Sequence, residues 1–135
     1  MNGTDKVVKF LQDAKVFYIA TIDGRHARVR PFGAALNIGG KLAICTGSRK
    51  NVARQIAANP NVEISAMTAD GKYIRVSGAL ADVSSDENRQ KFFDFMIGLA
   101  GLYKGKEAEL QILSFESATA TIADLAGNSE TINLE

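Results

Sequence analysis

One short segment has the composition of an anion-binding turn, Thr46-Gly47-Ser48-Arg49-Lys50. Residues 42–45 before it form an apolar, strand-like stretch, and residues 51–58 after it have the pattern of a helix. The first amides of a helix lack partners within the helix, and the helix dipole favours a negative charge there. We expect Ser48 to cap this helix and Arg49 and Lys50 to add two positive charges. The segment therefore predicts a phosphate site.

The basic residues are segregated along the chain. No acidic residue lies between Asp23 and Glu63, whereas this interval holds Arg25, Arg28, Arg30, Lys41, Arg49, Lys50 and Arg54. Because the whole chain has a formal net charge of only +1, this distribution favours a small anionic ligand over a nucleic acid. Two alternatives stay open from the residues alone. The turn could be a solvated helix start, and Arg28 and Arg30 could be solvated or paired with acids.

Length and composition limit the kind of protein. A chain of 135 residues with 46% hydrophobic residues is expected to fold as one domain, residues 1–135. No stretch approaches the roughly 20 apolar residues of a membrane span, and the N-terminus lacks a secretory pattern, so we expect a soluble cytoplasmic protein. The single cysteine and the single histidine, Cys45 and His26, argue against a metal site. Redox chemistry would then need an external cofactor.

The hydrophobic pattern predicts a mostly β protein. Strands are expected over residues 16–22, 25–36, 41–46, 62–68, 72–83, 111–124 and 129–134. Helices are expected over residues 4–15 and 51–58, and a third begins at Ser84 or Ser85. Pro31 indicates an edge strand or a bulge, and Gly78 a bulge. Short connections between successive strands predict a closed or partly closed antiparallel barrel with helices at its margins.

A barrel of this size has no room inside for a large ligand. A cofactor would lie on its surface or in a groove, where a second subunit could cover it. The third helix carries an apolar cluster that would belong to the core or to a dimer interface, Phe92, Phe93, Phe95 and Met96. Cys45 fits a small buried apolar residue better than a reactive thiol, and His26 fits a solvated turn residue. No catalytic side chain is predicted.

Several short segments, taken in order, resemble one known family. They are Phe17-Tyr18-Ile19-Ala20-Thr21-Ile22-Asp23-Gly24, Arg28-Val29-Arg30-Pro31-Phe32, Cys45-Thr46-Gly47-Ser48-Arg49-Lys50, Asn59-Pro60-Asn61-Val62 and Tyr73-Ile74-Arg75-Val76-Ser77-Gly78. Together they resemble the pyridoxamine 5'-phosphate oxidase-like proteins, which are FMN-binding split β-barrels. The resemblance covers nearly the whole chain, and it implies an antiparallel FMN-binding split β-barrel that forms a homodimer.

The resemblance also implies which residues bind FMN. Arg49 and Lys50 match the basic pair that grips the phosphate, and Arg28 or Arg30 matches the residue that reaches the phosphate or ribityl chain. Which arginine does so stays open. The full set implied is Arg28, Val29, Arg30, Pro31, Cys45, Thr46, Ser48, Arg49, Lys50 and Tyr73.

The function implied is that of an FMN-dependent oxidoreductase. Two flavin sites would lie at the subunit interface, with Leu102 and Tyr103 as part of the wall that the other subunit contributes to each. The chain stops at Glu135 without the arginine-containing segment that the true oxidases use on their substrate, so we expect no pyridoxamine 5'-phosphate oxidase activity. Electrons would pass from a reduced nicotinamide to a small acceptor such as a nitroaromatic or a quinone. The alternative is a protein that holds FMN, a haem-like group or a deazaflavin for storage or sensing.

Overall fold

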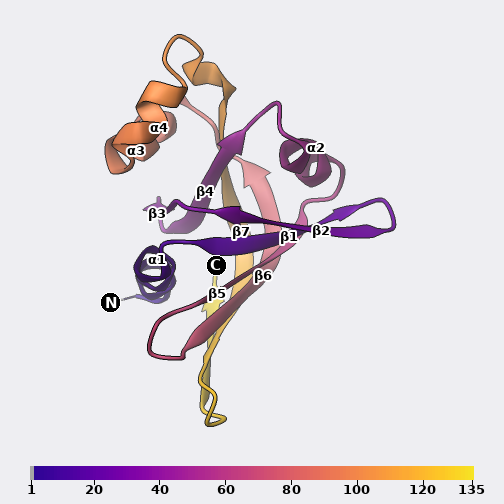
Figure 1. Ribbon diagram of the computed structural model, residues 1–135, viewed down its shortest axis with the longest axis vertical. Helices are drawn as coiled ribbons and strands as arrows, with labels where there is room; N and C mark the ends of the chain where they lie inside the picture. The colour runs from indigo at the N-terminus through magenta and orange to yellow at the C-terminus, as the bar shows by residue number, and fades with distance from the viewer. Residues whose placement is uncertain (1) are drawn as a thin grey trace.

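The computed structural model describes residues 2–135, which form one antiparallel sheet with helices at its margins (Figure 1). The strands are β1 (Phe17–Asp23), β2 (His26–Phe32), β3 (Ala35–Ile38), β4 (Lys41–Gly47), β5 (Asn61–Met67), β6 (Tyr73–Asp82), β7 (Leu110–Ala123) and β8 (Ser129–Leu134). The helices are α1 (Gly3–Ala14), α2 (Asn51–Ala58), α3 (Asp86–Phe95) and α4 (Ile97–Leu102), followed by a 3-10 turn at Glu107–Glu109.

The strand order shows that the sheet must curl. Its order is β2-β1-β5-β6-β7-β4-β3, with β8 on the second half of β7. The two end strands are consecutive in the chain, and only Gly33 and Ala34 separate Phe32 from Ala35. Three residue steps of chain span about 11 Å at most, so the two ends of the sheet lie close together. Among the described strands β2 and β3 are not paired with each other, and the result is the predicted partly closed barrel, split at this point.

The predicted strand over residues 25–36 is wrong because the chain changes partner within it. β2 pairs with β1 as far as Phe32, and β3 then pairs with β4 from Ala35. The expectation for Pro31 is confirmed, since β2 is an edge strand and needs no donor there. The expected bulge is also confirmed, because the β6–β7 register shifts between Gly78 and Leu80.

Two clusters of buried side chains fill the barrel and its flank. The larger one joins the apolar face of α1, through Val7 and Leu11, to inward-facing residues such as Ile19 and Ile64. The smaller one lies under α3, where Phe92 and Phe93 pack on β4 and β7. Phe95 and Met96 remain exposed (43% and 36%). The predicted apolar cluster is therefore half core and half surface.

The structure decides between the two serines expected at the start of α3 and contains one further short helix. Ser85 is the residue that caps α3, accepting a hydrogen bond from the Asn88 amide at 3.0 Å. Helix α4 was not expected, since Gly98 and Gly101 lower helix propensity. Figure 1 shows α3 and α4 together at one end of the molecule, with α2 beside the end of β4.

Candidate functional site

Helix α2 begins without a side-chain cap. The prediction that Ser48 caps it is wrong, because the residue before the helix is Lys50, and Lys50 makes no capping hydrogen bond. The turn runs on past Ser48: the Ser48 amide donates to the Glu109 carbonyl at 2.8 Å, and the Lys50 amide donates to the Gly47 carbonyl at 3.0 Å. The first turn of α2 contains no acidic residue. Its positive end is therefore available to an anion.

Two arginines face this helix from β2. The β1–β2 register pairs Arg30 with Ile19 and Arg28 with Thr21, so both arginines share the inner face of the barrel with these residues. Paired residues of antiparallel strands point to the same side of a sheet. Both arginines line the space between β2 and α2, so the inner face becomes polar at this end.

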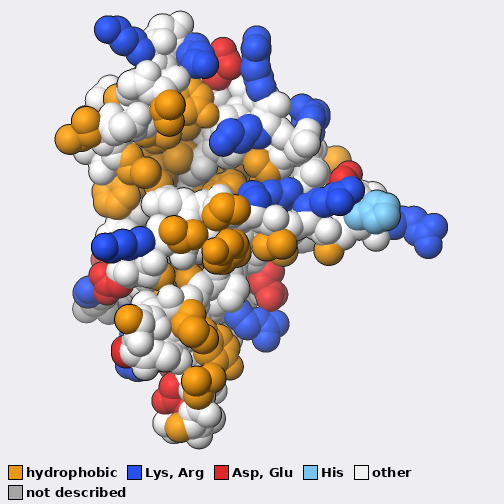
Figure 2. Space-filling view, in the orientation of Figure 1, with side chains coloured by type: hydrophobic (Ala, Val, Ile, Leu, Met, Phe, Trp, Pro, Cys, Tyr) orange, Lys and Arg blue, Asp and Glu red, His pale blue; other side chains and the backbone are white. Residues whose placement is uncertain are grey.

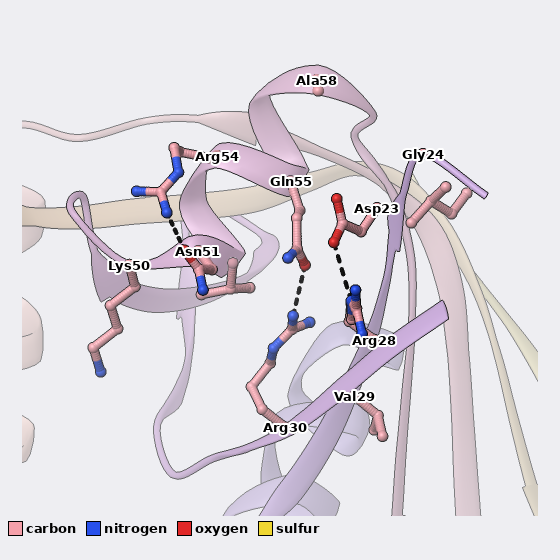
Figure 3. A pocket seen from close by; sticks show the side chains of 12 residues that line it. Asp23, Gly24, Arg28, Val29, Arg30, Lys50, Asn51, Arg54, Gln55 and Ala58 are labelled. Carbon is pink, nitrogen blue, oxygen red and sulfur yellow. Dashed lines mark hydrogen bonds and ion pairs between the residues drawn. The ribbon is translucent and has the colours of Figure 1, made fainter. Parts of the chain in front are cut away.

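Arg30 is held only by neutral acceptors. Its guanidinium donates to Thr21 Oγ1 and to Gln55 Oε1, both at 2.6 Å, and more weakly to the Ile19 carbonyl at 3.4 Å. Thr21 Oγ1 in turn donates to Gln55 Oε1 at 2.6 Å. Among the residues that the structure describes, Arg30 has no carboxylate partner. Figure 3 shows its bond to Gln55.

The charge of Arg30 persists at neutral pH. Partial burial lowers the pKa of its guanidinium, the charge of Arg28 lowers it further, and Asp23 acts in the opposite direction. An arginine nonetheless stays protonated in proteins. Arg30 therefore presents a fixed positive charge that no acid of the described chain neutralises.

A cavity of about 710 Å³ opens between β2 and α2 (Figure 3). Its cationic lining residues are Arg28, Arg30, Lys50 and Arg54, and its acidic one is Asp23. Asp23 is engaged already, since its Oδ2 lies 3.0 Å from Arg28 Nε. Arg54 folds back onto the Arg49 carbonyl and Asn51. Figure 2 shows Lys and Arg side chains gathered around this part of the surface.

A second cavity of about 260 Å³ adjoins the first. The two share Arg30, Lys50 and Val52 as lining residues. The second is lined mainly by apolar groups of β2, β4 and α4, and no acidic side chain is among its lining residues: Pro31, Phe32, Gly33, Ala34, Cys45, Thr46, Gly47, Met96, Leu99, Leu102, Tyr103 and Leu110. The joined cavities therefore suit a ligand with an anionic end and a flat apolar end.

Apart from the shared cations Arg30 and Lys50, two titratable side chains line the second cavity, Cys45 and Tyr103, and both are neutral. Burial raises the pKa of the Cys45 thiol to about 12, although Lys50 nearby acts in the opposite direction. Burial also raises the pKa of Tyr103, and the neighbouring Cys45 and Glu109 add to the effect. The Tyr103 hydroxyl lies directly over Gly47, where a Cβ would come within 2.7 Å of it. This corner supplies a thiol and a phenol, both protonated near neutral pH.

The structure brings together most of the residues predicted for the site. Arg28, Val29, Arg30 and Lys50 line the first cavity, and Arg30, Pro31, Cys45, Thr46 and Lys50 line the second. Neither lining includes the other three predicted residues, Ser48, Arg49 and Tyr73. The Arg49 side chain is 85% exposed, and its Nε lies 3.3 Å from Glu109 Oε1.

Tyr73, the third of these residues, lies outside both cavities. It pairs with Met67 across β5 and β6, and it lines a separate groove of about 520 Å³ with Val16, Tyr18 and Met67. Tyr18 neighbours the inward-facing Phe17 and Ile19, so its side chain is on the outer face of the sheet. Within one chain, this groove and the cavities that Arg28 and Arg30 line are separate.

Two contributors to the site were missed, Gln55 and Thr21. Thr21 could have been found from the sequence, since the alternation Phe17, Ile19, Thr21 puts a hydroxyl on the inner face, where a buried polar group needs a partner. For Gln55 no pattern in the sequence indicates such a role, because the role depends on how α2 packs against β1 and β2.

The single histidine of the chain lies outside the candidate site. His26 is exposed at the start of β2, and it is not among the lining residues of either cavity. Within residues 2–135 no group of three or more His, Cys, Asp or Glu side chains is arranged to hold a metal ion. No helix in that range has the length and apolar character needed to cross a membrane.

Comparison with known proteins gives one family match. Residues 4–123 match the family model described as pyridoxamine 5'-phosphate oxidase. No curated protein matches the chain.

Three solved structures illustrate the range of similar proteins. A NimC/NimA family protein from Clostridium acetobutylicum is 34% identical, with a TM-score of 0.92 over 98% of this chain and 92% of that chain. General Stress Protein 26 from Bacillus anthracis is 15% identical (TM-score 0.71, 98% and 100% covered). A heme binding protein from Mycobacterium smegmatis is 14% identical (TM-score 0.68, 90% and 56% covered). The last two share the fold.

Proposed function

Because this chain belongs to the pyridoxamine 5'-phosphate oxidase family, we propose that it binds FMN in the joined cavities and acts as a flavin-dependent oxidoreductase on a small acceptor. The observation that carries the proposal is the pair of cations, Arg30 and Lys50, at the junction of a cationic cavity and an apolar one. Neither has a carboxylate within ion-pair distance among the described residues.

The residues present fit the two ends of FMN. A phosphate monoester carries a charge of about −1.5 to −2 at neutral pH, which Arg30, Lys50 and the open end of α2 would balance. The ribityl chain and ring would then extend past Thr46 into the second cavity, against Pro31 and Cys45. Arg49 would join the phosphate only by leaving Glu109.

The chemistry that FMN supplies when bound is two-electron transfer between a reduced nicotinamide and an acceptor. The side chains of the second cavity shape where this happens. Leu99 and Leu102 of α4 line the apolar end with hydrocarbon, and Tyr103 would offer a phenolic proton to a bound group.

A homodimer is part of the proposal. The outer face of the sheet exposes large apolar side chains, with Val16 46%, Tyr18 50% and Met67 57% exposed. These residues line the groove that holds Tyr73, so a second copy packed there would cover them and bring Tyr73 into an interface. A Tyr18→Glu variant that still sediments as a dimer would count against this face.

Haem is less suited to the cavities than FMN. The mycobacterial structure is that of a heme binding protein, but haem iron needs an axial ligand. His26 lies outside both cavity linings, and raised pKa values, about 12 for Cys45, keep the Cys45 thiol and the Tyr103 phenol protonated near neutral pH. Met96 is then the haem ligand type that the lining offers, and its side chain is partly exposed.

The first test is a titration of the purified protein with FMN, followed by absorbance and flavin fluorescence. One FMN per chain, together with oxidation of reduced nicotinamide that depends on a nitroaromatic or a quinone, is the expected result. Binding without turnover would favour the storage or sensing alternative. Absence of binding would overturn the assignment of FMN.

A further inference from the structure

Gln55 makes two of the shortest hydrogen bonds in the site through a single atom. Its Oε1 accepts from Arg30 Nη2 and from Thr21 Oγ1, both at 2.6 Å. Thr21 Oγ1 also accepts from Arg30 Nη1 at 2.6 Å. Since Thr21 is only 2% exposed, it is a fixed point for this closed set of three side chains. The guanidinium of Arg30 is thereby oriented at two of its nitrogens.

The residue type at position 55 determines the net charge of the three hydrogen-bonded side chains, which is +1 with a glutamine. A glutamate would have nearly the same shape and could accept the same hydrogen bonds, but it would neutralise Arg30. The neighbouring arginine shows the contrast. Arg28, two residues along the same face of β2, is paired with Asp23 at 3.0 Å. Of the two arginines, the one without an acid is the one at the junction of the cavities.

We infer that Gln55 is a specificity-determining positioning residue: it fixes Arg30 toward the junction without cancelling its charge, and so sets the preference for a phosphorylated ligand over the same ligand without phosphate. The inference rests on the proposed function only for the identity of that ligand as FMN. An amide at this position gives orientation, while the charge stays available to the phosphate.

The decisive variant is Gln55→Glu, titrated with FMN and with riboflavin, which lacks the phosphate. We expect affinity for FMN to fall about tenfold or more, because one charge-assisted contact is lost. Affinity for riboflavin should change less than about twofold. Thermal unfolding should show a melting temperature at or above that of the wild type. An equal loss for both ligands, or no loss for FMN, would overturn the inference.

Two further variants separate position from charge. Gln55→Ala removes an anchor of Arg30 but leaves its charge, so its FMN loss should be smaller, about threefold, again without a loss for riboflavin. If Gln55→Glu does not fold, Gln55→Ala becomes the deciding variant. Unchanged FMN binding by Gln55→Ala would then refute the proposal that Gln55 positions Arg30. Asp23→Asn removes a nearby acid and frees Arg28 in the first cavity, while Gln55 still orients Arg30. If the double variant Gln55→Glu/Asp23→Asn bound FMN as tightly as the wild type, only the total charge would matter and the positioning role would be refuted.

A phosphate-only experiment separates this inference from the proposed function. If the wild type does not bind FMN, the proposed function fails. The melting temperature is then compared in sodium phosphate and in sodium chloride of equal ionic strength, since a bound ion stabilises the folded state. A phosphate-specific rise in the wild type that Gln55→Glu lacks would still support the inference. An equal rise in both proteins, or none in the wild type, would overturn it.

Discussion

Arg49 Nε lies 3.3 Å from Glu109 Oε1, and this ion pair turns the Arg49 side chain away from the cavities. The backbone fixes the pair from the other side, because the Ser48 amide donates to the Glu109 carbonyl at 2.8 Å. Glu109, just before β7, therefore holds the turn after β4 through both its backbone and its side chain. Exposed pairs of this kind contribute only about 0–1 kcal/mol, so the position of Arg49 is weakly held.

Removing the acid should free Arg49 for the phosphate. We expect Glu109→Gln to strengthen FMN binding about two- to fivefold at low salt, because the variant gains a mobile cation beside the site. Fluorescence titrations at low and high salt would measure the effect, which screening should reduce. Lys6→Gln breaks a comparable exposed pair with Glu130 and serves as the control. A Glu109→Gln protein that binds FMN like the wild type would show that Arg49 has no part in the site.

Lys50 should matter more than Arg49. Lys50 lines both cavities, so Lys50→Ala is expected to weaken FMN binding by about 1.5–3 kcal/mol, the contribution of a charge-assisted hydrogen bond. Arg49→Ala should cost less than about 1 kcal/mol. If the two losses add, the double variant should weaken binding by about 1.5–4 kcal/mol. Titration of the three variants measures this order, and equal losses in the single variants would contradict it.

The contact between Gly47 and Tyr103 is expected to be steric. A Cβ at position 47 would lie 2.7 Å from the Tyr103 hydroxyl, so Gly47→Ala should push Tyr103 out of place and weaken FMN binding. Because the crowding atom is the end of a side chain, the double variant Gly47→Ala/Tyr103→Phe should recover most of the loss. The coupling energy from the double-mutant cycle measures this. Strictly additive effects would rule out the contact.

Gly78 should be needed for stability, not for binding. A Cβ there would lie 2.5 Å from the Ser117 carbonyl oxygen and 3.1 Å from the Ala118 Cα, both backbone atoms of β7. Gly78→Ala is therefore expected to lower the free energy of unfolding by about 1–3 kcal/mol. Urea denaturation measures it. The matched control is Gly98→Ala in α4, where a Cβ meets nothing within 4 Å. A loss as large in the control would refute the steric explanation.

Cys45 should be unreactive at mildly alkaline pH. Burial raises its pKa from 9.0 to about 12, so at pH 8 its thiolate is about a thousandfold scarcer than that of an unperturbed thiol. Alkylation by iodoacetamide should be slower in the folded protein by a similar factor than in urea, and equal rates would contradict the raised pKa.

The same pKa shift predicts a dependence of stability on pH. Between about pH 9 and 12 the unfolded state gives up the Cys45 proton and the folded state keeps it. The unfolded state therefore binds fewer protons in this window, and stability falls as pH rises. Denaturation curves of the wild type and of Cys45→Ala would isolate this effect, because the variant lacks the titrating group.

The fold was largely predictable because its signals are local. The turn at Gly24, the edge position of Pro31 and the bulge at Gly78 each follow from the conformational limits of one residue. The break at residues 33–34 was not predictable in this way. It depends on which strands pair in space, and residues 25–36 read as one continuous β-rich run.

The site was predictable where charge and position coincide in the sequence. Arg30 and Lys50 were found because acids are absent around them. Ser48 was misread as a cap because the turn is fixed by Glu109, which lies far along the chain. Gln55 was missed for a similar reason, since its role exists only when α2 lies against β1 and β2.

Strand β7 pairs with β6 along one edge, and with β4 and then β8 along the other. During synthesis from the N-terminus, hairpins such as β1–β2 can form early, but β4 and β6 have no common partner until residues 110–123 have emerged. An unfinished chain therefore presents two unpaired strand edges, and such edges make a nascent protein prone to aggregate. We expect the yield of folded protein in cells to depend on the speed at which this last part of the chain is made.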